Sequence, residues 1–528
     1  MPFKNIVPVI ACILAVNLYA NDSNLCSAQK ASKGTLDIIS KMKNQPNKTG
    51  ITNIWIINPL RFSESEKVLL ATLQGLTSKQ KEIIWINSGG MDNIFLNQFK
   101  DLGINTVEID SVWELLPKYS STVKGFMLYK SGNNSINAAT SLCGPYSAVA
   151  IHESQKDKIE SFGFKMLADV RNLTEKEVFE KNKKLFTKNL MAEQNWKKSM
   201  YLRDFLVANN AFVFWDPQNV NRSEYLSHLN PGSLIYGFGN DELEWVKGIS
   251  KFQCAGIPSD WSLNLSIMSR LPVKIPNRPH KKLESSQKGQ RLVCFVMSDG
   301  DNIQWLAGGF VNSPGFWASK HRGNFNMTWE IAPIFSELAP KVLEHYYLTA
   351  TDNDDFVVGS SGLGYCFPSY LPDRKAFVKQ TIPYMKKSKL SIVSILNADG
   401  DMSVSKEFLD QPDVFGVLYK DYEPYNKEQG KIYWHNGKPC VSYKYLLWEN
   451  MKGASPAEVA NAINNLPASA EIDPNSYALI NVHAWSFNTI GGPMEAIKQT
   501  IDRLDEKTKV VTAQQFIEAL TKNISKKN

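Results

Sequence analysis

The sequence predicts an α/β protein in which an N-terminal α/β region of divergent units is followed by a (β/α) barrel. Three observations predict this fold class. Short apolar runs alternate with amphipathic stretches along most of the chain, which is typical of α/β layers. A proline- and lysine-rich segment interrupts that alternation once, and 528 residues are too many for one ordinary hydrophobic core.

The alternation of the first part runs from residue 51 to about 270. Two later rounds contain the strand-like runs GFMLYK, SAVAIHE, NAFVFWD and SLIYGFG. The three rounds differ in length and share no sharp motif, so we interpret them as divergent units of one N-terminal region, residues 21–271. The first round predicts strand, helix, strand and helix over residues 53–59, 65–78, 82–88 and 93–103.

The second part begins after the segment PVKIPNRPHKKLESSQKGQR. This segment lacks apolar periodicity and is interpreted as a linker over residues 272–290. Residues 291–528 contain seven strand candidates, with helical segments between several of them. This alternation predicts a (β/α) barrel, with an open doubly wound sheet as the alternative. In both folds, ligands bind at the C-terminal ends of the strands.

The first twenty residues, 1–20, predict a secretory signal peptide. A lone Lys4 precedes an apolar run, and Ala20 stands just before the polar residues NDSN, so cleavage is expected after Ala20. A lipoprotein signal at Cys12 is the alternative, although the apolar run continues beyond that cysteine. No later segment is apolar over enough residues to cross a bilayer. We expect an exported protein that is periplasmic, on the outer surface or secreted, without a transmembrane segment in the mature chain.

Charge and cysteine content exclude several classes of protein. The formal net charge of +7 is spread along the chain and forms no basic face, so nucleic acid is not an expected partner. Six cysteines remain after the predicted cleavage, without a C-x-x-C pair, which argues against a structural zinc site. We expect mostly buried thiols, with one or two disulfides permitted by an oxidising compartment.

Candidate chemistry lies where the first predicted barrel strand ends. The run LVCFVM is followed by SDGDNIQW, which places Asp299, Asp301, Asn302 and Trp305 at the C-terminal edge of this strand. Two carboxylates separated by one glycine can converge on one water or one metal. Solvated aspartates in an Asx turn are the alternative.

Further candidates follow other predicted strands. The strand LINVHAWSF leads to His483 and Trp485, and a histidine at this place is either a site group or a hydrogen-bonded core residue. The run YGFGNDELEWV places Glu242 and Glu244 before a helix, where capping also explains the carboxylates.

The loop GIPSDWSLNLS, with Asp260 and Trp261, has the polar and aromatic mixture of a sugar-contacting loop or of an interdomain packing segment. The motifs G-x-G-x-x-G opening a helix, G-x-x-x-x-G-K-[ST], H-E-x-x-H and G-x-S-x-G are missing, so nucleotide, zinc-protease and α/β-hydrolase functions lack support. Carboxylates and aromatics on an exported α/β barrel favour carbohydrate chemistry, because sugars stack on aromatic faces and paired carboxyl groups cut glycosidic bonds.

The segment GSSGLGYCFPSY carries a family resemblance. Its core, GLGYCFP from Gly362 to Pro368, matches the pattern G-x-G-Y-x-Y-P except that Phe367 replaces the second tyrosine. With SDGDN, YGFGNDE, LSIVSILNADGD and PSDWSLNLS in addition, the chain resembles the GxGYxYP family over nearly all of its mature length. This family consists of proposed glycoside hydrolases from gut bacteria of the Bacteroides type.

The resemblance implies a fold and a site. It implies an N-terminal region of three divergent repeats and a seven-stranded β/α barrel, with the site in the cleft between them. The family's proposed carboxylate triad falls on Asp299 and Asp301 of the D-x-D and on one glutamate of NDELE, Glu242 with Glu244 in reserve. The site is similar to that of certain inverting cellulases, which implies inversion without a cofactor or metal.

In this hypothesis Glu242 is the general acid, one aspartate is the base toward a water, and the other aspartate orients that water. The motif forms a wall of the cleft in front of a poly- or oligosaccharide, with Gly362 and Gly364 letting the backbone close and Tyr365 and Phe367 offering rings. The other expected substrate contacts are Asp260, Trp261, Asn302, Trp305, His483 and Trp485.

Two alternatives belong to other functional classes. FVMSDGD near the start of the barrel and VVTAQQFIEAL at its end are loosely similar to polysaccharide deacetylases, which use an aspartate and histidines on a metal. The H-x-x-x-H pair expected of such enzymes is missing from the sequence. The second alternative is a glycan-binding protein that keeps the cleft without turnover.

Overall fold

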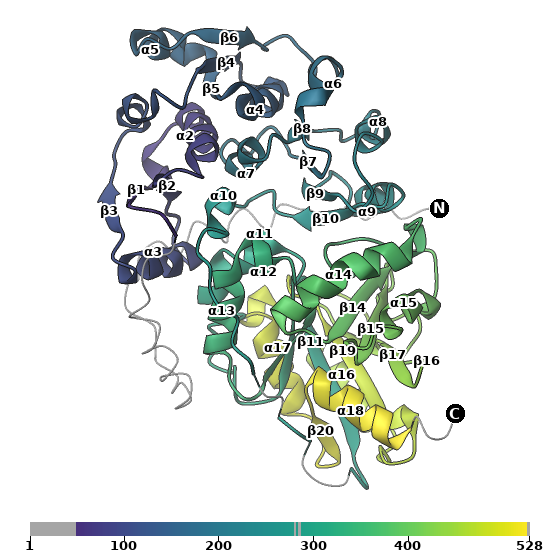
Figure 1. The fold of residues 1–528 in the computed structure, drawn as a ribbon. Helices are drawn as coiled ribbons and strands as arrows, with labels where there is room; N and C mark the ends of the chain where they lie inside the picture. The colour runs from purple at the N-terminus through teal and green to yellow at the C-terminus, as the bar shows by residue number, and fades with distance from the viewer. Residues whose placement is uncertain (1–48, 279–280, 284–286, 525–528) are drawn as a thin grey trace.

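A computed structural model describes residues 49–278, 281–283 and 287–524. The chain forms two parts, with three small parallel sheets in the N-terminal part and one large curled sheet in the C-terminal part (Figure 1). The mixed α/β fold class is therefore confirmed. The predicted signal peptide and Cys26 lie outside the described residues.

The three N-terminal sheets share one strand order, in which the first strand lies between the next two. All their strand pairings are parallel. This common order agrees with three units, although a repeat relationship between them stays a prediction. The sheets are β2-β1-β3 (Glu82–Ile86, Asn53–Ile57, Asn105–Glu108), β5-β4-β6 (Ala148–His152, Gly125–Tyr129, Met166–Asp169) and β10-β9-β7-β8 (Ala255–Pro258, Leu234–Gly237, Leu190–Glu193, Phe212–Phe214).

A helix follows the first strand of each sheet, and these three helices pack against one another in the middle of the N-terminal part (Figure 1). They are α2 (Glu64–Thr77), α4 (Ser135–Tyr146) and α7 (Arg203–Ala208). A Cβ on Gly75 of α2 would lie 2.5 Å from a backbone oxygen of α7, so this contact requires glycine. The remaining helices are α3 (Met91–Asp101), α5 (Lys156–Ser161), α6 (Glu175–Asn182), α8 (Arg222–Leu226), α9 (Glu242–Ser250) and α10 (Leu265–Met268).

The C-terminal part is built on one curled sheet in the order β16-β17-β15-β14-β13-β12-β11-β19-β18, with β20 beside β11. Its pairings are parallel except for β16 with β17. The strands are β11 (Arg291–Met297), β12 (Met327–Ile331), β13 (Asp354–Val358), β14 (Ile392–Asn397), β15 (Gly416–Asp421), β16 (Ile432–His435), β17 (Lys438–Ser442), β18 (Tyr445–Leu447), β19 (Tyr477–Val482) and β20 (Thr508–Val510).

The sheet curls because one chain segment reaches both of its sides. Only Tyr443 and Lys444 separate β17, which pairs with β15, from β18, which pairs with β19. The backbone N–H of Tyr443 donates to the carbonyl oxygen of Tyr419 on β15, and the backbone N–H of Lys444 donates to the carbonyl oxygen of Leu479 on β19. The strand order is nevertheless an open path, so a closed seven-stranded barrel stays a prediction.

Helices cover the outer face of the curled sheet, and α18 (Ala513–Asn523) closes the inner face near the strand starts. Phe516 and Leu520 of α18 share one apolar cluster with Leu292, Cys294 and other inward residues from most of the strands. The other helices are α11 (Ile303–Leu306), α12 (Phe335–Leu338), α13 (Pro340–Thr349), α14 (Arg374–Ser388), α15 (Lys406–Leu409), α16 (Pro456–Asn464) and α17 (Pro493–Ile501).

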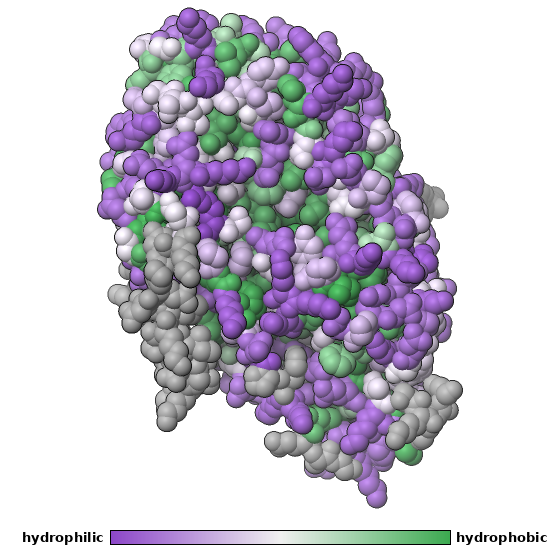
Figure 2. Space-filling view, viewed as in Figure 1, coloured by the Kyte–Doolittle hydropathy of each residue, from purple (hydrophilic) through white to green (hydrophobic). Residues whose placement is uncertain are grey.

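The described residues bear on the expected state of the cysteines and on the expected lack of a transmembrane segment. Cys143, Cys254, Cys294, Cys366 and Cys440 are buried free thiols, as expected for most of the cysteines. Across the described ranges, no helix is long and apolar enough to span a membrane. On the face drawn in Figure 2, hydrophilic residues predominate and hydrophobic ones form small patches among them.

Candidate active site

The two aspartates of the D-G-D sequence lie on the loop that follows β11, at the C-terminal edge of the curled sheet. Asp299 has a left-handed backbone, with φ of 68°. Gly300 passes so close to β12 that a Cβ would overlap the carbonyl group of Glu330. A Cβ on Gly359, which follows β13, would lie 2.7 Å from the backbone nitrogen of Asp301. The two glycines therefore let this loop pack against the ends of the two neighbouring strands.

Asp299 accepts hydrogen bonds on both carboxylate oxygens. The indole Nε1 of Trp485 donates to Oδ1 at 3.0 Å, and the Ser298 hydroxyl donates to Oδ2. The Ser298 hydroxyl is itself held in place, because it accepts a 3.2 Å hydrogen bond from the backbone N–H of Ala484. The two donors hold the Asp299 carboxyl group in one orientation, and a general base needs a fixed position of this kind.

Asp301 has a different environment from Asp299. Burial raises the pKa of Asp301 well above its usual range, and the negative charges of Asp299 and Glu330 raise it further, while Lys420 opposes them. Glu330 lies on the inner face of the sheet, where its Oε1 accepts from Lys420 Nζ at 2.7 Å and from the Ser394 hydroxyl at 2.6 Å. These effects favour the neutral form of Asp301.

The glutamate comes from the N-terminal part. Helix α9 begins at Glu242, with Asp241 as its N-cap accepting a 2.9 Å bond from the backbone N–H of Glu244. Glu244 is exposed, whereas Glu242 is partly buried. The hydroxyl of Tyr365 donates to Oε1 of Glu242 at 2.6 Å. The contact favours Glu242 over Glu244 as the site residue.

The environment of Glu242 suits a general acid. Burial raises the pKa of Glu242 to about 6, against the lowering effect of the Tyr365 hydrogen bond. The negative charges of Asp299, Asp241 and Glu423 also raise the pKa of Glu242. Glu242 is thus within electrostatic reach of Asp299, and its raised pKa suits a group that gives a proton.

The G-L-G-Y motif joins the two parts of the protein. Tyr365 and Gly256 of β10 form an antiparallel bridge, in which Gly256 N donates to Tyr365 O at 2.7 Å and Tyr365 N donates to Gly256 O at 2.8 Å. A Cβ on Gly364 would lie 2.7 Å from Gly256 O, so glycine is needed there. The motif thereby carries the Tyr365 hydroxyl across to Glu242.

The predicted role of the motif as a cleft wall needs correction. Tyr365 is 3% exposed and Phe367 is 0% exposed, so neither ring is free to stack on a sugar. Phe367 lies in an apolar cluster, where a phenylalanine ring packs as well as the tyrosine of the family pattern. Gly362 packs toward Phe377 and helix α14, away from the aspartates. The motif positions Glu242 through Tyr365, and Gly359, three residues before the motif, supports the loop of Asp301.

Trp485 lies beside Asp299 and Trp305 packs against Trp485, while the contact of both rings with a substrate stays a prediction. Their ring centroids are 4.7 Å apart, and Trp485 is 38% exposed while Trp305 also packs against Phe310 and Phe316. Asn302 is the N-cap of α11 and accepts a 3.4 Å bond from the backbone N–H of Trp305. Its side chain therefore has a structural contact.

His483 lies in the same corner of the site. Its ring stacks on Trp448 with centroids 3.7 Å apart and planes within 6°. Its Nδ1 is 2.7 Å from the Ser486 hydroxyl, and burial lowers the pKa of His483 while the charge of Asp299 opposes this. These contacts favour a neutral His483 ring, packed near Asp299.

Asp260 and Trp261 lie on the N-terminal side, next to α11. Asp260 is buried and paired with Lys198, whose ammonium also lies 4.5 Å from the centre of the Trp261 ring. Trp261 is 46% exposed, and its backbone N–H donates to Gln304 Oε1 at 2.5 Å. A cavity of about 350 Å³ opens beside Trp261 and Gln304. The Trp261 ring is therefore available to a ligand, and Asp260 is not.

Sequence reasoning missed four residues near the carboxyl groups. Tyr422, Glu423 and Tyr425 follow β15, and Trp448 follows β18. Burial raises the pKa of Tyr425 well above its usual range, and the negative charges of Glu242 and Asp299 raise it further. The signal that could have identified them is their position, since aromatic residues come directly after two strands.

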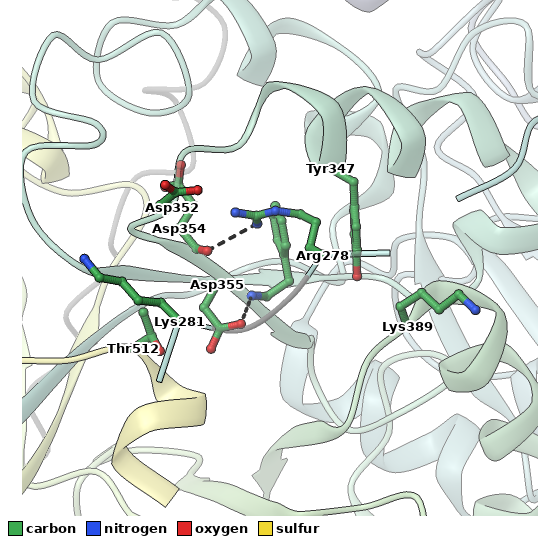
Figure 3. Close-up of a pocket in the computed structure, with 9 residues that line it drawn as sticks. Arg278, Lys281, Tyr347, Asp352, Asp354, Asp355, Lys389 and Thr512 are labelled. Carbon is green, nitrogen blue, oxygen red and sulfur yellow. Dashed lines mark hydrogen bonds between the residues drawn. The ribbon is translucent and has the colours of Figure 1, made fainter. Parts of the chain in front are cut away.

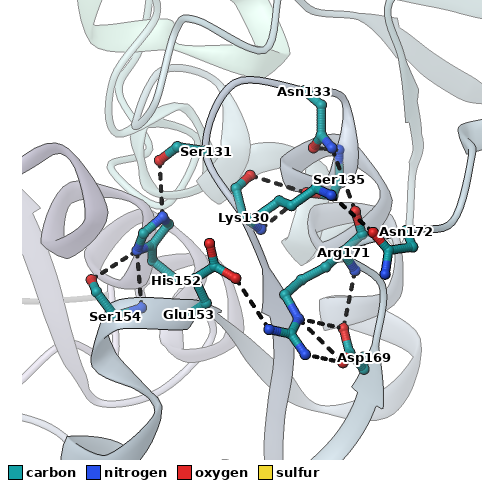
Figure 4. A network of polar contacts seen from close by, with 10 residues as sticks. All are labelled: Lys130, Ser131, Asn133, Ser135, His152, Glu153, Ser154, Asp169, Arg171 and Asn172. Atoms are coloured by element: carbon teal, nitrogen blue, oxygen red, sulfur yellow. Dashed lines mark hydrogen bonds and ion pairs between the residues drawn. The ribbon is translucent and has the colours of Figure 1, made fainter.

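Two polar clusters lie elsewhere. A cavity of about 480 Å³ lies near the start of β13, the opposite end from the aspartates, and is lined by Arg278, Asp354 and neighbouring residues (Figure 3). At the ends of β4 to β6, His152 contacts Ser131 and Ser154, and Arg171 pairs with Asp169 and Glu153 (Figure 4). Within the described ranges, no three His, Cys, Asp or Glu side chains are placed to hold a metal ion.

The fold and this arrangement define a two-part α/β protein with carboxyl groups from both parts at one edge of its large sheet. The chain belongs to the GxGYxYP family. Residues 290–521 match the profile described as the GxGYxYP putative glycoside hydrolase C-terminal domain. Residues 123–198 match the GxGYxYP_N second domain, and residues 184–270 match the GxGYxYP third domain.

One similar solved structure supports the same conclusion. It is a crystal structure described as a putative hydrolase from Bacteroides thetaiotaomicron VPI-5482. The two chains are 29% identical, the TM-score is 0.82, and the match covers 91% of this chain and 98% of the other. Comparison with curated proteins gives no significant match. The family description and this structure support a hydrolase-like role.

Proposed function

We propose that the protein is a glycoside hydrolase in which Glu242 is the general acid and Asp299 is the general base. The observation that carries this proposal is the contrast between the two carboxyl groups. Burial and neighbouring charge raise the pKa of Glu242 to about 6, whereas Asp299 has a hydrogen-bond donor on each oxygen. Glycosidases need one carboxyl group that gives a proton and another that takes one.

The proposed reaction is direct displacement by water. Glu242 gives its proton to the glycosidic oxygen, and the bond between that oxygen and the anomeric carbon breaks. A water attacks the anomeric carbon from the opposite face and gives its proton to Asp299, which inverts the configuration. Tyr365 fixes the orientation of the Glu242 carboxyl through Oε1 and leaves Oε2 for the transferred proton. Asp301 orients the attacking water in its neutral form.

The proposed substrate is a polysaccharide or oligosaccharide that meets the protein outside the cytoplasm. Exposed rings at Trp485 and Trp261 support this, because carbohydrates bind by stacking their apolar faces on aromatic side chains. Trp261 lies beside α11, the helix that follows the aspartate loop, so a chain of several sugars could extend from Asp299 toward it. The predicted export stays part of this proposal.

The test is product analysis across a panel of plant and host glycans, with wild-type protein and the variants Glu242→Gln and Asp299→Asn. We expect a single anomer of the product from wild type and a loss of about 10²- to 10⁴-fold in rate for each variant. Unchanged hydrolysis by both folded variants would overturn the assignment. Release of acetate without chain cleavage, or glycan binding without any product, would replace the hydrolase with one of the two alternative functions.

A further inference from the structure

Four rings form a continuous surface along the edge of the site. Tyr422 and Tyr425 have ring centroids 6.0 Å apart, Tyr425 and Trp448 5.0 Å, and Trp448 and His483 3.7 Å. We call these four residues the aromatic wall. They come from three segments that each follow a strand of the curled sheet, namely β15, β18 and β19.

The two ends of the aromatic wall reach the two proposed catalytic groups. At one end, Tyr422 contacts Phe367 at 5.6 Å, and Phe367 contacts Tyr365, whose hydroxyl donates to Glu242. At the other end, His483 stands two residues before Trp485, whose indole donates to Asp299. In the middle of the wall, Tyr425 is close enough to both Glu242 and Asp299 for the charges of both to act on it, so a molecule between the two carboxyl groups would pass this part of the wall.

The aromatic wall differs from the buried rings behind it. Tyr365 and Phe367 are 3% and 0% exposed, whereas all four wall residues are partly exposed. In the part of the chain that the structure describes, the Tyr425 hydroxyl and the Trp448 indole N–H make no hydrogen bond to protein. A sugar ring offers an apolar face for the rings and hydroxyl groups for such polar atoms at their edges.

The charge around the wall selects among sugars. The charged groups that act on Glu242 are Asp299, Asp241 and Glu423, and all three are negative. Two nearby lysines have carboxylate partners, since Lys420 contacts Glu330 at 2.7 Å and Lys247 contacts Asp399 at 3.3 Å. Lys427 is exposed beyond Tyr425, where its charge acts on Asp421 and Asp399. A uronic acid or sulfated sugar placed between Glu242 and Asp299 would therefore meet repulsion from this group of carboxylates.

We infer that the aromatic wall is a binding surface for uncharged sugar units, and that the protein acts on neutral glycans and rejects acidic ones. This inference rests on the proposed function, because it names the substrate class of that same site. Stacking supplies affinity for any pyranose with an apolar face, and the surrounding carboxylates exclude the charged ones.

The experiment measures binding by calorimetry near pH 7 with the full mature chain. The neutral probes are cellohexaose, xylohexaose and mannohexaose, and the charged probe is hexagalacturonate. The wall variants are Trp448→Ala and Tyr425→Ala, and the matched control is Trp434→Ala on the edge strand β16. Melting temperatures identify any variant that is misfolded, and Tyr425→Phe, which keeps the ring, replaces Tyr425→Ala in that case.

We expect at least one neutral hexasaccharide to bind at least tenfold more tightly than hexagalacturonate. Each wall variant to alanine should weaken that binding about tenfold, whereas Trp434→Ala leaves it within twofold. Equal or tighter binding of hexagalacturonate, no binding of any neutral probe, or unchanged binding by both folded wall variants would overturn the inference.

Prolonged incubation of the same mixtures separates this inference from the proposed function. Binding of a neutral probe to the wall without any product would support the aromatic wall and contradict the hydrolase. Hydrolysis that proceeds unchanged in the wall variants would support the hydrolase and contradict the wall.

Discussion

Glu242 and Asp299 show how two parts of one molecule give the same chemical group two different properties. Glu242 begins a helix of the N-terminal part, is partly buried and has a single hydroxyl donor from Tyr365. Asp299 lies on a loop of the C-terminal part and has donors on both oxygens. In the proposed mechanism, burial and hydrogen-bond partners, and not residue type, distinguish the acid from the base.

The two sides also depend on each other through the motif. Residues after β13 support the Asp301 loop through Gly359 and reach Glu242 through Tyr365. The same short segment thus touches both sides of the site and also pairs with β10. A defect in this segment should therefore affect the position of the acid and of the aspartates together.

The largest expected difference between the variants Glu242→Gln and Asp299→Asn is in how their rates depend on the leaving group of the substrate. Asp299→Asn should lose about 10³-fold or more on both a natural glycan and an aryl glycoside with an acidic phenol. Glu242→Gln should lose about 10³-fold on the glycan but less than tenfold on the aryl glycoside, because that leaving group needs no proton. Steady-state rates of the two variants on the two substrates check this. The reverse pattern would exchange the two roles.

The next largest effect concerns the aspartate loop. Gly300→Ala places a methyl group against the backbone of Glu330, so we expect the free energy of unfolding to fall by about 3 kcal/mol. Gly309→Ala is the control, because nothing lies within 4 Å of a Cβ there. Chemical denaturation of both variants measures the difference. Equal stability of the two variants would show that the loop is not packed against β12 in this way.

A smaller effect is expected from the donor to the acid. Tyr365→Phe removes a hydrogen bond that lowers the pKa of Glu242, so that pKa should rise. Because a general acid must be protonated, activity should then persist to a pH higher by up to about one unit. The pH dependence of kcat/KM on a glycan checks this shift, and an unchanged profile with unchanged Tm would contradict it.

The smallest effect has the opposite sign. Glu423→Gln removes one of the negative charges that raise the pKa of Glu242, so the loss of activity should begin at a slightly lower pH. Glu423 is exposed, so we expect only a few tenths of a pH unit, reduced further at high salt. Profiles at low and high ionic strength test this. A shift toward higher pH would mean that Glu423 does not act on the acid through its charge.

Sequence reasoning predicted the parts of the fold with strong apolar runs. The buried run LVCFVM is β11, and the strand candidates near Trp329, Phe356 and Ile395 are β12, β13 and β14. It missed β17 and β18, because residues 438–447 contain a proline and two lysines and form strands through their partners β15 and β19. It also missed β16, the short edge strand that pairs with β17. Tertiary pairing determined this segment, and local pattern did not.

The site was predictable to a similar degree. Strand ends indicated Asp299 and Trp485, because parallel strands bring their C-terminal ends to one edge, and the family resemblance indicated Glu242. The roles of Tyr365 and Phe367 could not be read from the motif, because burial depends on the bridge to Gly256, which is more than a hundred residues away. Tyr425 and Trp448 gave only a positional signal, and the contact between them is set by the curled sheet.

The central claim is that Glu242 delivers the proton, and the most direct measurement is the pH dependence of kcat/KM for wild type and Glu242→Gln on an aryl glycoside with a leaving group of intermediate acidity. With the pKa of Glu242 raised to about 6, wild-type activity should fall as the pH rises above that value, since the acid is then ionised. The account predicts that this fall disappears in Glu242→Gln. A fall that persists unchanged in the variant would contradict it.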